Sequence, residues 1–207
     1  MSSRVETVAA GILAAAEGKT RFIVAIAGPP GAGKSTFVED LSATLGGLGS
    51  SAKIVPMDGF HLDDAVLRER GLLARKGAPE TFDARGLVDI VRAIRAARED
   101  VFVPLFDRSR ELAIAAARAV TPKDRIILLE GNYLLLDQNP WRQLPALVDH
   151  TIMLMPPEDI LRERLIRRWL DLGTTEEDAR ARVMENDLPN GSLVRTRSST
   201  ADVTLYR

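Results

Sequence analysis

The chain has 207 residues, a net charge of −1 and a hydrophobic fraction of 45%. This length suits one globular domain, and the near-neutral charge argues against a general attraction to nucleic acid or to an anionic membrane. Cysteine is absent, which excludes disulfides and thiolate metal sites. No apolar run approaches membrane-spanning length and the first residues lack the features of a signal peptide, so we expect a cytoplasmic protein.

Apolar runs typical of strands alternate with stretches typical of helices. The predicted strands cover 21–27, 52–57, 101–106, 125–129, 151–155 and 201–206, and the predicted helices cover 4–17, 36–45, 62–73, 86–98, 141–148, 157–172 and a segment from Thr175. Residues 113–120 are ambiguous, because their alanines favour a helix whereas their position between two strands allows a strand. Residues 188–200 are predicted to be a loop. The alternation is typical of a parallel α/β sheet with helices on both faces.

A glycine-rich segment after the first predicted strand fits the pattern G-x-x-x-x-G-K-S/T of a phosphate-binding P-loop. Glycines let the backbone wrap around phosphates, and the positive end of the following helix favours the same anion. Lys34 would neutralise the outer phosphates, and the Ser35 hydroxyl would bind the Mg²⁺ that bridges them. The flanking strand and helix argue against a chance glycine-rich turn. The predicted nucleotide-binding residues are Gly28, Pro29, Pro30, Gly31, Ala32, Gly33, Lys34, Ser35 and Thr36.

Acidic residues follow two other predicted strands. Asp58 comes after the strand at 52–57, and Glu130 comes after the strand at 125–129. Ligands of such sheets bind outside the carboxyl ends of the strands, so we expect both residues to converge on the P-loop. Asp58 could accept the proton of an attacking hydroxyl, and Glu130 could hold Mg²⁺ through its waters. An ordinary Asp-Gly turn and an ordinary strand end are the structural alternatives.

The predicted helix at 157–172 carries Arg164, Arg167 and Arg168 at i, i+3 and i+4 spacing. These arginines could close over the phosphates and neutralise charge in the transition state. On spacing alone, a solvated helix face explains them as well. His61 has two open interpretations, a substrate contact and a structural role.

Three further motifs give the sequence a family resemblance: Asp58-Gly-Phe-His61, Arg75-Lys-Gly-Ala-Pro-Glu-Thr-Phe-Asp83 and Glu130-Gly-Asn-Tyr133. With the P-loop they resemble the P-loop kinases that include uridine kinase, bacterial pantothenate kinase and phosphoribulokinase. Within this group the chain resembles small bacterial proteins described as fructokinases or sugar-transport-associated kinases. The resemblance runs from about residue 20 to the C-terminus. It implies a three-layer α/β P-loop NTPase fold, with 1–207 as one domain and a helical lid at about 157–190.

The resemblance also implies roles for single residues. Asp58 matches the family's catalytic aspartate, and Phe106 stands where the family's P-x-Y segment has a tyrosine, which removes a hydroxyl group. It implies a strand at 113–120, against the helix propensity of its alanines. The expected catalytic residues are Asp58, Lys34, Arg164 and Arg167; the expected substrate-binding residues are Asp58, His61, Asp83, Arg108, Tyr133 and Arg168; the expected metal-binding residues are Ser35 and Glu130.

The function implied by the resemblance is an ATP- and Mg²⁺-dependent kinase that phosphorylates a hydroxyl of a small molecule. A sugar is the first acceptor to consider, and nucleoside and pantothenate acceptors stay open because one scaffold serves different substrates. A nucleotide-binding regulatory NTPase is the alternative from another class, although no switch-loop signature supports it. The charge and the few aromatic residues argue against nucleic acid as a partner. No membrane partner is expected, and a homodimer stays open.

Overall fold

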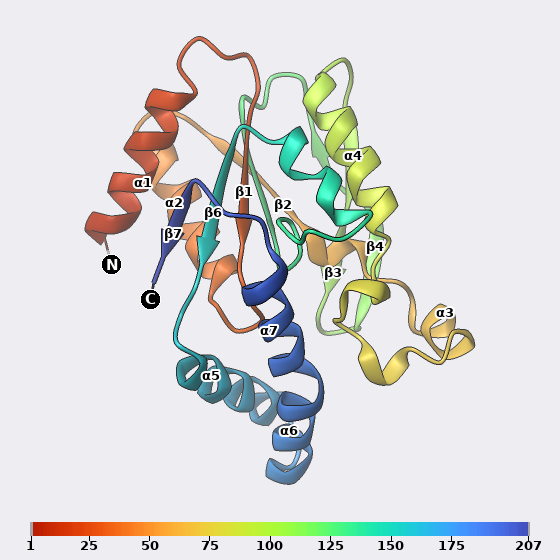
Figure 1. Ribbon diagram of the computed structural model, residues 1–207. Coiled ribbons are helices and arrows are strands. Elements are labelled where there is room, and N and C mark those ends of the chain that lie inside the picture. The colour runs from red at the N-terminus through yellow and green to blue at the C-terminus, as the bar shows by residue number, and fades with distance from the viewer. Residues whose placement is uncertain (1, 207) are drawn as a thin grey trace.

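The computed structural model describes residues 2–206, and its central element is a five-stranded parallel sheet (Figure 1). The sheet has the order β2-β5-β1-β6-β7. Its strands are β1 (Phe22–Ala27), β2 (Ala52–Pro56), β5 (Ile126–Gly131), β6 (His150–Leu154) and β7 (Val203–Leu205). Every residue of β1 is buried, as expected for a central strand that is covered on both faces. The ends of β2, β5 and β1 that carry the predicted site residues therefore lie side by side.

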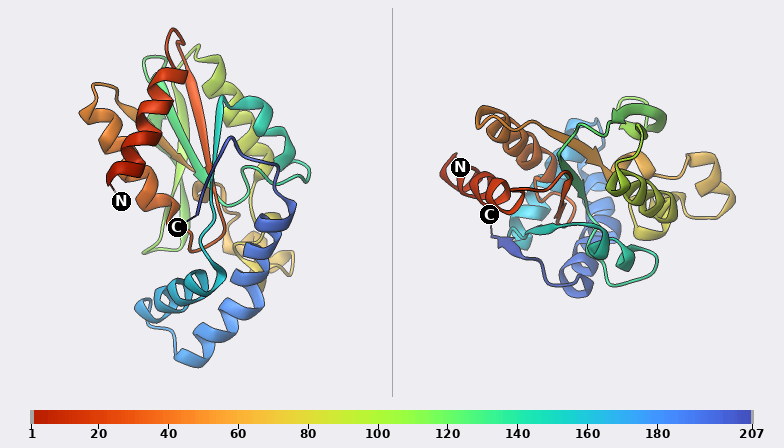
Figure 2. Two further views of the ribbon diagram at one scale, coloured as in Figure 1. Left: turned by 60° about the vertical axis from the view of Figure 1, so that its left-hand side comes forward. Right: turned by 90° about the horizontal axis from the view of Figure 1, so that it is seen from above.

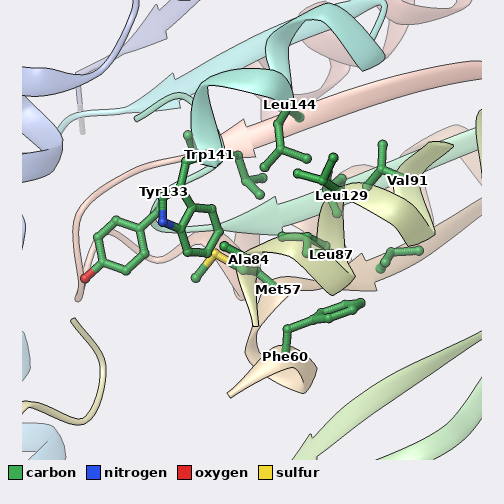
Figure 3. Close-up of a cluster of buried hydrophobic side chains, with 14 of the residues drawn as sticks. Met57, Phe60, Ala84, Leu87, Val91, Leu129, Tyr133, Trp141 and Leu144 are labelled. Atoms are coloured by element: carbon green, nitrogen blue, oxygen red, sulfur yellow. The ribbon is translucent and has the colours of Figure 1, made fainter. Parts of the chain in front are cut away.

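Helices cover both faces of this sheet, as Figure 2 shows. On one face lie α1 (Ser2–Ala15) and α2 (Lys34–Gly47), and on the other lie α4 (Ala84–Ala96) and the 3₁₀ turns η4 (Trp141–Gln143) and η5 (Pro145–Leu147). Because side chains alternate along a strand, Ile23 of β1 joins the core beneath α4, whereas Val24 joins the core beneath α1 and α2. Figure 3 shows part of the core beneath α4, including Leu87 and Leu129. The predicted three-layer α/β fold is confirmed.

Two strands form an antiparallel hairpin apart from the main sheet. They are β3 (Val101–Asp107) and β4 (Leu112–Val120). The strand that the resemblance implied at 113–120 is confirmed, because cross-strand pairing overrides the helix propensity of alanine. Where β3 packs on the 3₁₀ turn η1 (Met57–Phe60), a Cβ atom added to Gly59 would lie 2.3 Å from the carbonyl oxygen of Pro104. This close approach fixes the hairpin beside the end of β2.

A helical projection extends beyond the carboxyl ends of the strands (Figure 1). It contains α5 (Glu158–Asp171), α6 (Glu176–Arg182) and the π-helical turn η6 (Val183–Asp187), and α7 (Leu188–Arg197) leads back to the sheet. The prediction of a loop at 188–200 is wrong, because α7 covers most of this segment. Pro189 lies in the first turn of α7, where its missing N–H group costs little, and Asn190 and Gly191 are buried against the rest of the protein. This packing, and not local propensity, determines the helix.

Two other predicted helices are shorter than expected. The helix expected at 62–73 is α3 (Asp64–Glu69), and separate 3₁₀ turns follow at η2 (Leu73–Arg75) and η3 (Pro79–Thr81). Gly71 has a φ of 67°, which stops α3 from continuing. The helix expected at 141–148 is divided into η4 and η5. Among residues 2–206, no helix combines the length and the apolar character needed to cross a bilayer.

Candidate active site

The loop between β1 and α2 encloses the ammonium group of Lys34. Gly31 and Gly33 have φ angles of 78° and 80°, in the left-handed region that favours glycine. The Lys34 Nζ donates to the carbonyl oxygens of Gly28 and Pro29, each at 3.1 Å. Because α2 begins at Lys34, the positive end of its helix dipole lies at the same loop. Backbone N–H groups, a helix N-terminus and a full positive charge together make a phosphate site.

Asn132 completes the surroundings of Lys34, and it was not among the residues expected from the sequence. Its Oδ1 accepts a hydrogen bond from the Lys34 Nζ at 2.6 Å. Burial lowers the pKa of Lys34, and the negative charges of Glu130 and Asp58 oppose that shift. The signal that could have identified Asn132 was its position in the Glu130–Tyr133 motif, directly after the end of β5. Lys34 is thus held in place by three protein acceptors, whose hydrogen bonds a phosphate can replace.

Glu130 and Ser35 lie together beside the P-loop. Glu130 is 7% exposed near the end of β5, and its carboxyl group lies near the Ser35 hydroxyl. Burial raises the pKa of Glu130 to about 7, although the Lys34 charge and the nearby Ser35 hydroxyl oppose this rise. Hydroxyl and carboxylate oxygens are ligands that Mg²⁺ prefers. Within the described part of the chain, no group of three or more His, Asp or Glu residues could hold a metal. The pair could hold a Mg²⁺ whose remaining ligands would be phosphate oxygens and water.

Asp58 lies in η1, directly after β2, and is paired with an arginine of the hairpin. The Nη2 of Arg108 lies 2.6 Å from Asp58 Oδ2. His61 Nδ1 donates to the Asp58 carbonyl oxygen at 2.8 Å, and the His61 ring packs against Phe82 and Phe106 at centroid distances of 4.0 and 4.8 Å. Burial lowers the pKa of His61, which favours the neutral imidazole. His61 therefore links the end of β2 to the hairpin.

Asp83 and Tyr133 each make a hydrogen bond with the backbone. The Asp83 Oδ1 accepts a hydrogen bond from the backbone N–H of Gly86 at 2.9 Å and so caps α4. Tyr133 is fully buried among aromatic side chains (Figure 3), and its hydroxyl donates to the Gly77 carbonyl at 2.6 Å. Contrary to the sequence-based expectation, the structure places Tyr133 in the core and not on a surface that a substrate could contact. It anchors the segment that contains Gly77.

A cavity of about 360 Å³ lies between α5 and the tip of the hairpin. We call it the arginine cavity; it is lined by Arg108, Glu111, Arg164, Arg167, Arg168, Asp171 and Leu172. The Nη1 of Arg164 donates to the Gly31 carbonyl at 3.4 Å. Burial and the nearby Arg108 charge lower the pKa of Arg168. The structure thus brings the three predicted lid arginines together with Arg108, beside the P-loop.

A hydrogen-bonded network joins the segment before Asp83 to the projection. Arg75 donates to Asn186 Oδ1 at 2.9 Å and to Asn190 Oδ1 at 3.3 Å, and Asn186 donates to the Lys76 carbonyl at 2.9 Å. A Cβ atom on Gly191 would lie 3.5 Å from the side chain of Pro29. Sequence reasoning missed Asn186 and Asn190, since they pair with residues more than 100 positions away. The network connects the lid, the Arg75–Asp83 motif and the P-loop.

Comparisons with known proteins agree with this geometry. The model of the Phosphoribulokinase / Uridine kinase family matches residues 23–206. Protein YggC of Escherichia coli K12, which is uncharacterized, is 37% identical over 186 residues, or 88% of this chain and 76% of that protein. A pantothenate kinase of Myxococcus xanthus is 32% identical over 76% of this chain and 52% of its own length. A crystal structure from Silicibacter sp. TM1040, described as a candidate fructose transport system kinase, has a TM-score of 0.91 at 43% identity and covers 97% of this chain and 98% of that one.

Proposed function

Because the chain belongs to the phosphoribulokinase / uridine kinase family, we propose that it transfers the γ-phosphoryl group of ATP to a hydroxyl group of a small molecule. The chain is an ATP-dependent phosphotransferase, in keeping with its family. The observation that supports a hydroxyl acceptor is the proximity of Asp58, Lys34 and Glu130, whose charges act on one another at the ends of adjacent strands. A phosphate site, a metal site and a carboxylate base are the parts that phosphoryl transfer to a hydroxyl needs.

The donor phosphates would occupy the P-loop. Its backbone N–H groups and Lys34 would bind the β- and γ-phosphates, in place of the protein acceptors that now hold the Lys34 ammonium group. Ser35 and Glu130 would hold Mg²⁺, which supplies positive charge between the phosphates when it is bound. Since burial raises the pKa of Glu130 to about 7, its ionised form requires a neutral or higher pH, or a nearby cation.

Asp58 would receive the proton of the acceptor. The acceptor oxygen forms a bond to the γ-phosphorus, and the bond from that phosphorus to the bridging oxygen breaks, so that ADP leaves. The hydroxyl proton passes to the Asp58 carboxylate. Arg108 now contacts Oδ2 of that carboxylate, so the acceptor either displaces Arg108 or uses Oδ1. Arg164 and Arg167 would neutralise the developing charge from the lid.

We propose a sugar as the first acceptor to test, a choice supported by the description of the Silicibacter relative. Nucleoside and pantothenate acceptors are the alternatives, and the Myxococcus xanthus pantothenate kinase supports the second of these. A coupled assay of ATP consumption over sugars, sugar phosphates, nucleosides and pantothenate separates them. Nucleotide turnover that depends on no acceptor in this panel would favour a regulatory NTPase and overturn the proposal.

The Asp58→Asn variant tests the role of the base. Because a base acts in the transition state, we expect kcat to fall by about 100-fold or more while the Kd of ATP stays within about threefold. Asp89→Asn is the matched control, since Asp89 is exposed on α4 and pairs with Arg92. An unchanged kcat in Asp58→Asn would remove Asp58 from this role.

A further inference from the structure

We propose that the acceptor carries an anionic group, a phosphate or a carboxylate, and that Arg108 and Arg168 bind this group in the arginine cavity. This inference rests on the proposed function, because it assigns a substrate class to the same site. It goes further in separating two sets of arginines, one for the donor and one for the acceptor.

The charges that line the cavity do not balance. Four arginines line it together with two acidic residues, Glu111 and Asp171. One of these acids is shared, since Glu111 Oε2 also lies 3.3 Å from the Lys76 Nζ. The guanidinium groups also repel one another, and the charge of Arg108 helps to lower the pKa of Arg168. A bound anion relieves that repulsion, and guanidinium groups bind phosphates and carboxylates with paired hydrogen bonds.

The arginines face two different parts of the site. Arg164 belongs to the donor side, because its Nη1 donates to the Gly31 carbonyl and lies 3.8 Å from the position of a Cβ atom on Gly33. Arg108 belongs to the acceptor side, because it contacts the Asp58 carboxylate at 2.6 Å. Arg168 interacts electrostatically with both Arg108 and Asp58. The γ-phosphate at the P-loop therefore meets Arg164 first, and the acceptor-side guanidinium groups are left for a second anion.

The dimensions favour a small acceptor. An anion that binds Arg108 lies close to Asp58, because one guanidinium nitrogen already contacts that carboxylate at 2.6 Å. The acceptor's anionic group and its reacting hydroxyl are then only a few bonds apart. A cavity of about 360 Å³ is near the lower end of ligand pockets. Sugar phosphates and hydroxy acids of a few carbons match these limits.

An ordinary solvated arginine face is the competing explanation. Arg162 shows what such a residue looks like on the same helix: it pairs with Glu158 one turn away at 3.3 Å and does not line the cavity. Arg168, by contrast, lines the cavity and interacts electrostatically with Arg108 and Asp58. This contrast makes Arg162→Gln the matched control for substitutions in the cavity.

Matched pairs of acceptors test the inference: fructose against fructose 6-phosphate, ribose against ribose 5-phosphate, glycerol against glycerate, and pantothenol against pantothenate. We expect the anionic member to have the higher kcat/KM by about 100-fold or more in at least one pair. The phosphate and carboxylate pairs distinguish the two anions. In Arg168→Gln the acceptor KM should rise about 10-fold or more, with little change in the ATP KM, and Arg162→Gln should behave as wild type. Equal or higher kcat/KM for the neutral members would overturn the inference and leave the proposed function intact.

A binding measurement covers the case in which none of these compounds is phosphorylated, which would count against the proposed function. The protein is saturated with Mg²⁺ and a non-hydrolysable ATP analogue, so that the γ-phosphate position is filled, and inorganic phosphate is titrated by calorimetry. We expect saturable binding that Arg168→Gln weakens about 10-fold and Arg162→Gln leaves unchanged. No saturable binding, or binding that Arg168→Gln does not weaken, would overturn the anion site independently of catalysis.

Discussion

The donor and acceptor sides of the candidate site are built in different ways. On the donor side, Lys34 and Glu130 are 9% and 7% exposed and are surrounded by β1, β5 and α2. On the acceptor side, the side chains of Asp58 and Arg108 are 27% and 53% exposed, and Arg108 comes from the tip of a two-stranded hairpin. The donor side is preorganised by the core of the protein, whereas the acceptor side is assembled from the hairpin and the helical projection, which lie outside the main sheet.

This difference reflects what each side must recognise. A triphosphate is one ligand with one shape, so its site can be buried and rigid. Acceptors differ among relatives that share the scaffold, and residues on loops and hairpins can change without disturbing the core. The acceptor side is nevertheless tied to the donor side, because the Arg75–Asn186–Asn190 network and the packing of Gly191 on Pro29 join them.

Removal of the donor-side charge should have the largest effect. Lys34→Met deletes the buried cation that would act on the transferred phosphate, and we expect kcat/KM to fall by about 100- to 1,000-fold. Lys123→Met is the control, since Lys123 is exposed in the turn before β5. Steady-state kinetics with the best acceptor of the panel make the measurement. A loss below tenfold would mean that the preorganised side does not carry the phosphate interaction.

The pH dependence of stability tests the ionisation of the Glu130 carboxyl group. Its pKa is raised to about 7 from 4.5, so its protonated form stabilises the ligand-free fold. This contribution is complete below pH 4.5 and is lost as the pH rises through 7, with an upper limit of roughly 3 kcal/mol. Thermal melts of wild type and Glu130→Gln should therefore diverge between these pH values, with the wild type losing stability relative to the variant. Affinity for Mg²⁺ and nucleotide should change in the opposite direction and rise with pH. Parallel melting curves would show that Glu130 does not titrate in this range.

Gly59→Ala tests the acceptor side alone. Its Cβ atom would meet the backbone of Pro104, so the hairpin must shift away from η1, and we expect a loss of about 1–3 kcal/mol in stability. Arg108 would lose its alignment with Asp58, so the acceptor KM should rise while nucleotide affinity stays near wild type. Chemical denaturation and nucleotide titration measure the two quantities, with Gly46→Ala as control because its Cβ atom would meet no neighbouring group within 4 Å. Equal losses of both affinities would show that the two sides are not separable.

The smallest effect is expected for Tyr133→Phe. The variant removes the hydroxyl that donates to the Gly77 carbonyl and leaves the buried ring in place, so stability should fall by about 1 kcal/mol. The freed segment lies next to Arg75 and Lys76, so the acceptor KM should increase slightly while kcat changes little. Urea denaturation and acceptor kinetics measure these effects. A large fall in kcat would indicate that the Tyr133 hydroxyl contacts the substrate.

The donor side could be predicted from the sequence because its signals are local. The P-loop follows a strand and opens a helix within one short segment, so backbone conformation, charge and dipole all follow from neighbouring residues. Strand ends likewise brought Asp58 and Glu130 to the correct edge of the sheet, since parallel strands share that edge.

What could not be predicted depends on contacts between distant segments. Asn190 and Gly191 have poor helix propensity, and only packing against Arg75 and Pro29 makes them part of α7. The direction of the Tyr133 hydroxyl depends on the position of Gly77, which no periodicity reports. Arg108 reaches Asp58 because the hairpin folds over η1, a geometry set by the close approach at Gly59.

The two tryptophans lie in different regions, one in the core and one in the lid, so their fluorescence reports on different surroundings. Trp141 is 2% exposed in the core beneath α4, where a ligand at the strand ends leaves its surroundings unchanged. Trp169 lies on α5, donates to Asp187 Oδ2 at 2.8 Å and has the Arg182 guanidinium 4.8 Å from its ring. A rearrangement of the lid helices alters those partners and with them the emission of Trp169, while Trp141 supplies a constant background. In Trp141→Phe a single tryptophan remains, so stopped-flow fluorescence with selective tryptophan excitation can time a rearrangement of the lid helices in a protein that needs no attached dye.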